Sequence, residues 1–288
     1  MTSPRALLTA WDIQAKKQLG QNFLKDPNVA RSIVGHAAID AADVVLEIGP
    51  GLGAITVPAA KAARKLIAID KDGRIIGLLR TELLAAGIDN VEIREADILK
   101  TNLTAVHADY GRKMVVMGNL PYNISSQVVV QLIHARSRVD RAVLMLQKEM
   151  AQRICADPGS KAYGRLSVML GYCSQTRVLM QVNAAQFFPA PKVDSTVIGI
   201  QFMDPPPFLA DDEAFLFRVI KTAFGKRRKT LRNALSQSDL DLTPARCERL
   251  LAGADIDPML RAERLSVRNF VDLANIIYRY REDKKAKN

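Results

Sequence analysis

The residues best suited to chemistry in this chain directly follow one apolar run. Residues 114–117 are all Met or Val, which predicts a buried strand of a parallel sheet. That run leads into residues 118–125, which read GNLPYNIS. In open α/β sheets, ligands bind outside the carboxyl ends of the strands. We therefore expect Asn119, Leu120, Pro121 and Tyr122 at a ligand-binding edge.

These four residue types suit the alkylation of an exocyclic aromatic amine, whose lone pair is delocalised into its ring. The side-chain oxygen of Asn119 and the backbone carbonyl of Leu120 can accept the amine hydrogens and steer the lone pair out of the ring plane. Pro121 fixes φ and removes a competing donor. Tyr122 offers a flat face on which a base can stack, worth about 1–3 kcal/mol. A plain strand-to-helix turn is the alternative, because these residues are all ordinary there.

A glycine turn follows another predicted strand. Residues 44–48 predict a short buried strand, residues 49–53 read GPGLG, and a helix is expected through Ala60. Strand, glycine turn and helix together form a nucleotide-cofactor arrangement, because the backbone can approach a ligand closely where no Cβ intrudes. The spacing is G-x-G-x-G, whereas dinucleotide binders have G-x-G-x-x-G. Gly49 and Gly51 therefore indicate S-adenosylmethionine rather than NAD.

Acidic side chains follow the next two predicted strands. The strand at residues 66–69 ends at Asp70, about 20 residues beyond the glycines, where a ribose-hydroxyl acceptor is expected. Asp72 is the alternative, although it better suits the N-cap of a helix from Gly73. The strand at residues 91–94 is followed by Asp97, which can accept from the amino group of a cofactor adenine. An exposed loop aspartate is the alternative for Asp97. Polar groups at several neighbouring strand ends are stronger evidence than any single motif.

Composition narrows the class of protein. The 288 residues suffice for one large domain and a small one. The net charge of +11 favours a polyanionic partner over an anionic membrane surface. The three cysteines and three histidines are dispersed without a Cys-x-x-Cys pair, so neither a disulfide framework nor a metal site is expected. With no secretory signal and no apolar run long enough for a bilayer, we expect a reducing, cytoplasmic setting without a membrane partner.

Two later regions bear on the substrate. Phe187 and Phe188 lie between two strands expected to close the sheet, where one ring can cover a flat substrate, and core packing of both is the alternative.

Residues 204–207 read DPPP and predict a linker to a helical region. Within that region the densest basic run favours phosphate contact over a merely solvated face. Its basic residues are Lys226, Arg227, Arg228, Lys229 and Arg232.

With these residues identified, the chain closely resembles the rRNA adenine N6,N6-dimethyltransferase family. The resemblance is carried by LGQNFLKD at residues 19–26, VLEIGPGLGAIT at 45–56, GNLPYNIS at 118–125, YGRLSVM at 163–169 and FFPAPKVDS at 187–195. It implies a class I methyltransferase fold, which is a seven-stranded, mostly parallel α/β sheet with helices on both faces and a small helical C-terminal domain. We expect a catalytic domain at residues 1–203 and a helical RNA-binding domain at residues 208–288.

The resemblance also implies an activity. Four methyl groups would pass from S-adenosylmethionine to the N6 amines of two adjacent adenosines, leaving S-adenosylhomocysteine. The adenosines lie in a hairpin loop near the 3′ end of small-subunit rRNA. The expected partner is an immature small ribosomal subunit late in assembly, and the expected protein is a monomer that uses no metal. We expect direct in-line transfer to a flipped or unpaired adenine, without a covalent enzyme intermediate or a strong general base.

Carried over by position, the family's cofactor contacts fall on Asn22, Leu24, Gly49, Asp70, Asp97 and Asn119. The family usually has glutamate where Asp70 stands, so the ribose contact here would use a side chain one methylene shorter, and Asp72 could share it. Tyr122 matches one aromatic residue that flanks the target base. Phe187 or Phe188 matches the other.

Two alternatives remain. The related large-subunit rRNA adenine methyltransferases that confer antibiotic resistance share the fold, but they typically read Asn-Ile-Pro-Tyr where this chain has Leu120, and they lack a match to FFPAPKVDS. A non-catalytic RNA-binding assembly or transcription factor on the same scaffold is the other alternative. The intact glycine turn, Asp97 and Asn119 argue against a loss of catalysis.

Overall fold

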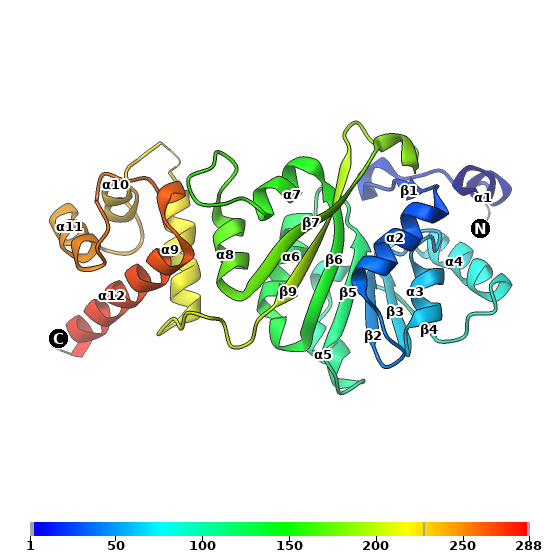
Figure 1. Ribbon diagram of the computed structural model, residues 1–288, viewed down its shortest axis with the longest axis horizontal. Helices are drawn as coiled ribbons and strands as arrows, with labels where there is room; N and C mark the ends of the chain where they lie inside the picture. The colour runs from blue at the N-terminus through cyan, green and yellow to red at the C-terminus, as the bar shows by residue number, and fades with distance from the viewer. Residues whose placement is uncertain (1–2, 227, 287–288) are drawn as a thin grey trace. The chain divides into compact units, whose positions relative to one another are not determined.

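Seven strands form one continuous sheet in the computed structural model, which describes residues 3–226 and 228–286 (Figure 1). Their order across the sheet is β4-β3-β2-β5-β6-β9-β7. Strands β2 to β6 run parallel to one another, and β9 is antiparallel to β6. The bounds are β2 Val44–Ile48, β3 Lys65–Asp70, β4 Val91–Glu95, β5 Met114–Asn119, β6 Val139–Gln147, β7 Ser174–Val182 and β9 Ser195–Phe202. The predicted α/β class with a seven-stranded, mostly parallel sheet is confirmed.

The sheet order reverses between β2 and β5, which lie side by side although β3 and β4 separate them in sequence. Every residue of β2 is buried, as are the first five of β5, because helices cover a parallel sheet on both faces. Gly118 permits the close approach of these strands, since a Cβ there would lie 2.5 Å from the backbone oxygen of Ile48. The crossover brings the ends of β2, β3 and β5 to one edge.

Helices cover the sheet, with α2 and α3 in front of it and α6 behind it in Figure 1. In the first part of the chain the helices are α1 Pro4–Ala10, α2 Pro27–Ala37, α3 Thr56–Ala62, α4 Gly73–Ala85, α5 Leu103–Ala108, α6 Ser125–His134 and α7 Lys148–Ile154. The predicted N-cap at Asp72 is confirmed, because its carboxylate accepts from the backbone N–H of Arg74, and Asp26 caps α2 in the same way through the N–H of Asn28. Short 3-10 turns at residues 17–19, 98–100, 136–138, 184–186 and 262–264 complete the connections.

A two-residue strand pair, which sequence patterning missed, joins two distant loops. Strand β1, Phe23–Leu24, runs antiparallel to β8, Phe187–Phe188, with Phe23 opposite Phe188 and Leu24 opposite Phe187. The pair continues beyond its strands, because the N–H of Lys25 donates to the carbonyl of Gln186 over 2.8 Å. A strand of this length has no measurable alternation of apolar and polar residues, so its pairing has no sequence signature.

The chain divides into two compact units. The first contains the residues up to Ala151 together with Gln175–Phe202, and the second contains Gln152–Ser174 and the residues from Met203 on. The second unit is helical, with α8 Arg165–Cys173, α9 Glu213–Phe224, α10 Leu231–Ser236, α11 Pro244–Gly253 and α12 Val267–Ala286. The structure thus adds residues 152–174 to the region expected beyond residue 208. That the two regions fold as separate domains stays a prediction.

Aromatic pairs form much of the interior of the second unit. The ring centroids of Phe224 and Phe270 are 5.7 Å apart in a stacked arrangement, and those of Tyr172 and Phe217 are 5.9 Å apart, edge to face.

None of the helices within residues 3–226 and 228–286 combines the length and hydropathy that a bilayer span needs. In the same residues, no three His, Cys, Asp or Glu side chains gather as a metal centre requires.

Replacing Gly118 by alanine should destabilise the first unit, since the new methyl group would press on the backbone of β2. We expect a loss of about 1–3 kcal/mol in the free energy of unfolding, measured by urea denaturation. Gly77→Ala in α4 is the matched control, because a Cβ there meets nothing within 4 Å. That change should stabilise the helix by about 0.5–1 kcal/mol. Equal effects of the two substitutions would contradict the close approach.

Candidate active site

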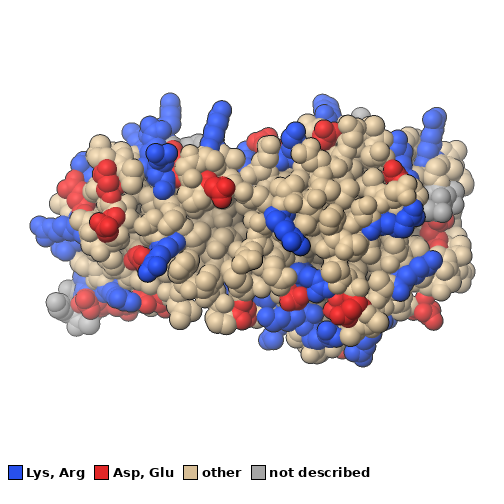
Figure 2. All heavy atoms as spheres, viewed as in Figure 1, with Lys and Arg blue, Asp and Glu red and all other residues tan. Residues whose placement is uncertain are grey.

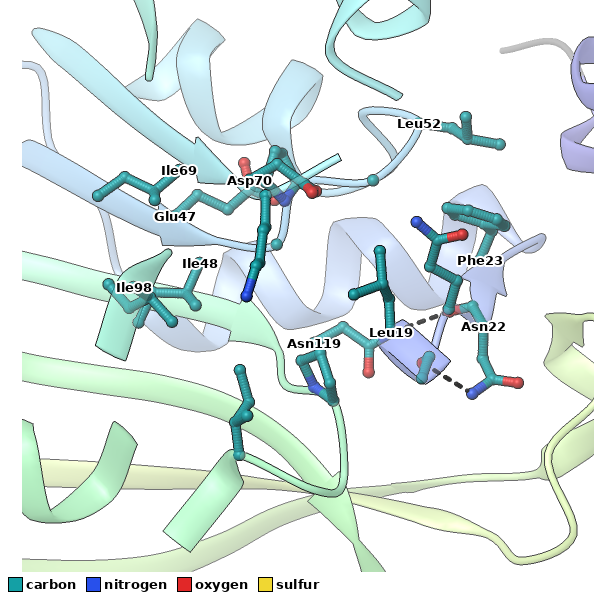
Figure 3. Close-up of a pocket in the computed structure, with 18 of the residues that line it drawn as sticks. Leu19, Asn22, Phe23, Glu47, Ile48, Leu52, Ile69, Asp70, Ile98 and Asn119 are labelled. Atoms are coloured by element: carbon teal, nitrogen blue, oxygen red, sulfur yellow. Dashed lines mark hydrogen bonds between the residues drawn. The ribbon is translucent and has the colours of Figure 1, made fainter. Parts of the chain in front are cut away.

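A cavity of about 330 Å³ lies at the carboxyl ends of β2, β3 and β5, where the sequence predicts a ligand site (Figure 3). Its apolar walls include Ile48, Leu52, Ile69 and Ile98. Several of the predicted site residues line it, namely Asn22, Leu24, Gly49, Gly51, Asp70, Asp97, Asn119 and Pro121. Leu120, Tyr122, Phe187 and Phe188 are not among its lining residues. The predicted residues thus divide into a group around the cavity and a group beside it.

The glycine turn lines the cavity with Gly49, Pro50, Gly51 and Leu52. Gly51 has a φ of +53°, a conformation that side chains disfavour, and a Cβ there would lie 3.1 Å from the ring of Phe23. The helix α3 begins at Thr56, five residues later. The backbone here is exposed to a ligand because neither Gly49 nor Gly51 carries a side chain.

Glu47 is a site residue that the sequence reasoning missed. It points from β2 into the cavity wall with 1% of its surface exposed, and its Oε2 has no hydrogen-bond partner among the described residues. Burial raises the pKa of Glu47 to about 8, an effect that the Thr56 hydroxyl opposes and the Asp70 carboxylate strengthens. The available signal was a charged residue inside the otherwise apolar run of residues 44–48. Because a nearby cation would favour the ionised form of Glu47, this position fits a positively charged ligand.

Asp70 and Asp72 have different surroundings. Asp70 lies beside Glu47 in Figure 3 and lines the cavity, and it accepts a hydrogen bond from the N–H of Asp72 over 2.9 Å. Burial raises the pKa of Asp70, although backbone hydrogen bonds from Asp72, Lys71 and Gly51 oppose the shift. Asp72 is not among the residues that line the cavity. Of the two carboxylates that the sequence left as alternatives, the structure places Asp70 at the cavity.

Asp72 instead anchors the segment that precedes β1. Its carboxylate accepts from Lys16 over 3.3 Å, from Gln21 over 3.1 Å and from Arg74 over 3.1 Å. Burial alone would raise the pKa of Asp72, but hydrogen bonds from Arg74, Gln21 and Lys16 outweigh it and lower the pKa to about 2. The segment held in this way continues directly into Asn22.

Asp97, which follows β4, also lines the cavity. One of its oxygens accepts from the N–H of Leu99 over 3.0 Å, and the other accepts from Lys71 Nζ over 2.8 Å. The hydrogen bond from Lys71 is the main cause that lowers the pKa of Asp97, so this carboxylate is ionised at neutral pH. It remains partly accessible to a ligand in the cavity.

The amide of Asn119 has a defined orientation. Its Nδ2 donates to the backbone carbonyl of Asn22 over 3.0 Å, and Asn22 Nδ2 donates to the carbonyl of Gly20 over 3.1 Å (Figure 3). Because the amino end of the Asn119 amide is directed at a carbonyl, the Oδ1 atom is the end left to accept from a ligand. A Cβ at Gly20 would lie 3.2 Å from the ring of Pro121, so the same segment also packs on that proline.

The residues expected to hold the target amine or to flank its base include four that do not line the cavity. The Leu120 side chain is buried, and its N–H donates to the carbonyl of Met145 over 3.1 Å. Tyr122 is half-buried, and burial raises its pKa while the Ser195 hydroxyl opposes the shift. Phe187 is 2% exposed within the core of the first unit, whereas Phe188 is half-buried. Phe188 is thus the accessible member of the pair.

The basic run lies in the second unit. Lys226, Arg228 and Lys229 are exposed, and Lys226 Nζ donates to the backbone carbonyl of Gln237 over 3.2 Å. Arg232 pairs with Glu248 over 2.8 Å. Arg227, the fifth predicted phosphate contact, lies outside the described residues. On the face of the molecule that Figure 2 draws, Lys and Arg are spread widely with acidic residues between them, so charge alone does not delimit an RNA surface there.

Comparison with known proteins matches nearly the whole chain. A family model described as Ribosomal RNA adenine dimethylase matches residues 13–279. A Desulforapulum autotrophicum protein named Ribosomal RNA small subunit methyltransferase A is 50% identical over 278 residues, which are 96% of this chain and 97% of that protein. A Magnetococcus marinus protein of the same name is 43% identical over 271 residues, with coverage of 94% and 95%.

Solved structures show the same fold. A dimethyladenosine transferase from Plasmodium falciparum superposes with a TM-score of 0.77 at 29% identity, over 92% of this chain and 98% of that one. The 23S rRNA methyltransferase ErmE superposes with a TM-score of 0.69 over 89% of this chain and 100% of that one, and at 24% identity this likeness concerns the fold alone. The predicted class I methyltransferase fold is confirmed.

Replacing Asp72 by asparagine should reduce stability in a pH-dependent way. A carboxyl pKa of about 2 in the folded chain, against 3.8 when unfolded, contributes at most about 2 kcal/mol above pH 4. This contribution is lost as the pH falls from 4 towards 2. Urea denaturation of the wild type and Asp72→Asn should therefore differ at pH 6 and converge near pH 2. Asp89→Asn, at an exposed site, is the control. A pH-independent difference would contradict the ion-pair anchor.

As the pH rises, the ligand-free wild type should lose unfolding free energy that the Glu47→Gln variant keeps. The folded-state pKa of about 8 lies above the unfolded value of 4.5, so the wild type loses stability between these pH values. The slope is about 1.4 kcal/mol per pH unit at most. Because glutamine does not ionise, its unfolding free energy should lack this slope in the same urea titration. If the unfolding free energies of the wild type and Glu47→Gln changed in parallel with pH, the raised pKa of Glu47 would be contradicted.

Proposed function

The chain belongs to the ribosomal RNA adenine dimethylase family and is a methyltransferase, and from this we propose its substrate and the roles of its residues. It dimethylates the N6 amines of two adjacent adenosines in the hairpin loop near the 3′ end of small-subunit rRNA. The observation that carries the proposal is the oriented amide of Asn119 at the cavity, with its acceptor oxygen left for an amine. The family and the named relatives support the choice of an adenine as substrate.

S-adenosylmethionine is the cofactor that we assign to the cavity, where it would supply an electrophilic methyl group. The residues present fit this molecule. Glu47 offers an uncompensated buried carboxylate to a cationic ligand, and Gly49 and Gly51 leave the backbone open to close approach. Asp70, rather than Asp72, would accept from the ribose hydroxyls, since it lines the cavity. Asp97 would accept from the adenine amino group, and Asn22 and Leu24 would cover the ligand.

The residues at the end of β5 would hold the target amine. Asn119 Oδ1 and the Leu120 carbonyl accept its hydrogens, which directs the nitrogen lone pair out of the ring plane. Tyr122 stacks on the adenine, and Phe188 is the second flanking ring because it is more exposed than Phe187. No general base is needed, because the nitrogen becomes acidic as it gains a methyl group and releases its proton to solvent.

The second methylation places a further demand on the same residues. After one transfer the amine retains one hydrogen, so either Asn119 or Leu120 loses its partner. The pocket must then accept an amine that already carries a methyl group. The half-buried rather than fully enclosed state of Tyr122 is compatible with that requirement.

The partner that we infer is an immature small ribosomal subunit, bound by a monomer in the cytoplasm, where ribosomes assemble. Lys226, Arg228 and Lys229 would contact phosphates, because they are exposed and basic. Arg232 would have to exchange its ion pair with Glu248 for such a contact. Arg227 is assigned to the same role from the sequence alone.

Methylation of large-subunit rRNA instead of small-subunit rRNA would overturn the proposed substrate. Mass spectrometry of both rRNAs distinguishes these two outcomes.

Replacing Asn119 by alanine should lower kcat for methyl transfer by about a hundredfold or more, because one acceptor for the reacting amine is removed. The assay is transfer of radiolabelled methyl groups from S-adenosylmethionine to immature small subunits. Mass spectrometry of the rRNA 3′ hairpin then locates the product.

Asn28→Ala, an equal change at an exposed position on α2, is the matched control and should keep the wild-type rate. Binding of S-adenosylhomocysteine reports whether the Asn119 variant retains its cavity. Wild-type rates from Asn119→Ala would overturn the assigned role, and no label from the wild type would overturn the proposed activity.

A further inference from the structure

A second cavity, of about 310 Å³, lies wholly within the helical unit. It is formed by the loop before α8, the end of α9 and the basic loop that follows it, and the 3-10 turn before α12. Its volume is at the lower end of the range of roughly 300–1,000 Å³ found for small-ligand pockets. None of its lining residues belongs to the proposed methyl-transfer site.

Tyr163 gives this cavity an unsatisfied donor. The residue is 6% exposed, and its hydroxyl has no hydrogen-bond partner among the residues that the structure describes. Buried tyrosine hydroxyls normally find a partner, so the missing acceptor is expected from a ligand. Burial raises the pKa of Tyr163 to about 12, and the charge of Asp157 adds to this, so the hydroxyl remains a donor at neutral pH.

Aromatic rings form the apolar part of the cavity. Tyr163 and Phe224 meet edge to face with their centroids 6.2 Å apart at 66°. Phe224 is held in turn by its stacked contact with Phe270. A rigid aromatic wall of this kind suits a flat ring, which can stack or pack against it without ordering flexible side chains.

Charged groups surround the aromatic wall. Arg228 and Arg261 are exposed cations from two separate loops, and guanidinium groups bind phosphate in a bidentate manner. Glu263 supplies a carboxylate that can accept from an amino or hydroxyl group. Its backbone is fixed, because its carbonyl accepts from the N–H of Gly159 over 2.7 Å. Donors for an anion and an acceptor for a base or sugar thus adjoin one flat apolar surface.

We propose that this cavity binds one unpaired nucleotide of the RNA substrate, with the base against Phe224, the Tyr163 hydroxyl donating to the base and the phosphate on Arg228 and Arg261. An unpaired nucleotide is favoured because its base edge and phosphate are both free for such contacts. The inference rests on the proposed RNA substrate, but it concerns a site apart from the transferred methyl group. It gives the helical unit a means to recognise RNA shape beyond simple charge.

Binding of adenosine 5′-monophosphate to the full chain tests the proposal. Saturating S-adenosylhomocysteine blocks the first cavity, and ligand-observed NMR titration measures the binding that persists. We expect Tyr163→Phe to weaken that binding roughly three- to tenfold, because one hydrogen bond is lost. Arg261→Ala should weaken it about tenfold. Arg249→Ala, at an exposed arginine on α11, is the matched control and should have no effect.

Three results would overturn the site. They are full displacement of the nucleotide by S-adenosylhomocysteine, wild-type binding by both Tyr163→Phe and Arg261→Ala, and inorganic phosphate binding as tightly as the nucleotide. Thermal unfolding checks the fold of each variant, and Tyr163→Phe carries the test if Arg261→Ala does not fold. Methyl transfer by the wild type is measured separately, so failure of the proposed function and failure of this site are distinguishable.

Discussion

The hydrogen bond from Asn119 to the backbone carbonyl of Asn22 is the interaction on which the rest of the site depends. A free asparagine amide can present either end to a ligand, and only the oxygen can accept from an amine. Because the amino group of the Asn119 amide donates to the carbonyl of Asn22, the oxygen of that amide is the end left for a ligand. That carbonyl is itself held in place, because Asp72 binds Lys16 and Gln21 and because Gly20 packs on Pro121. The orientation of one side chain at the end of β5 thus depends on a chain segment almost a hundred residues earlier.

The sheet supplies the second constraint. Strands β2 and β5 lie side by side with Gly118 against the backbone of Ile48, so the glycine turn and the Asn119 segment emerge next to each other. A ligand in the cavity between them contacts both segments at once. Glu47 lies in β2 just before the turn, and burial raises its pKa to about 8, so its side chain is mostly protonated at neutral pH in the ligand-free chain. A cationic ligand in the cavity would favour the ionised form, so ligand binding and the protonation of Glu47 are coupled.

Periodicity and motif spacing predicted individual strands, the helix N-cap at Asp72 and the common edge of the strand ends, because these depend on local sequence and on the rules of parallel sheets. The seven-stranded sheet as a whole was implied by the family resemblance. They left Asp72 as an alternative to Asp70, since both lie near the end of the same strand and only tertiary contacts distinguish them. Glu47 was overlooked because it lies within a strand pattern that is otherwise apolar. The difference between Phe187 and Phe188 depends on the β1–β8 register, and the second cavity depends on loops distant in sequence. Such contacts leave no periodic signal.

The two-residue pair of β1 and β8 has a consequence for the wall of the cavity. It joins the segment before α2 to the loop between β7 and β9 through very few backbone hydrogen bonds, so the entropy of the long chain loop that it closes is offset mainly by side-chain burial. Phe23, Leu24 and Phe187 supply that burial. Phe23 and Leu24 also line the cavity, and Phe188 lies opposite Phe23 in the pair. A substitution that loosens this packing would therefore disturb the cavity wall and the half-buried Phe188 ring together.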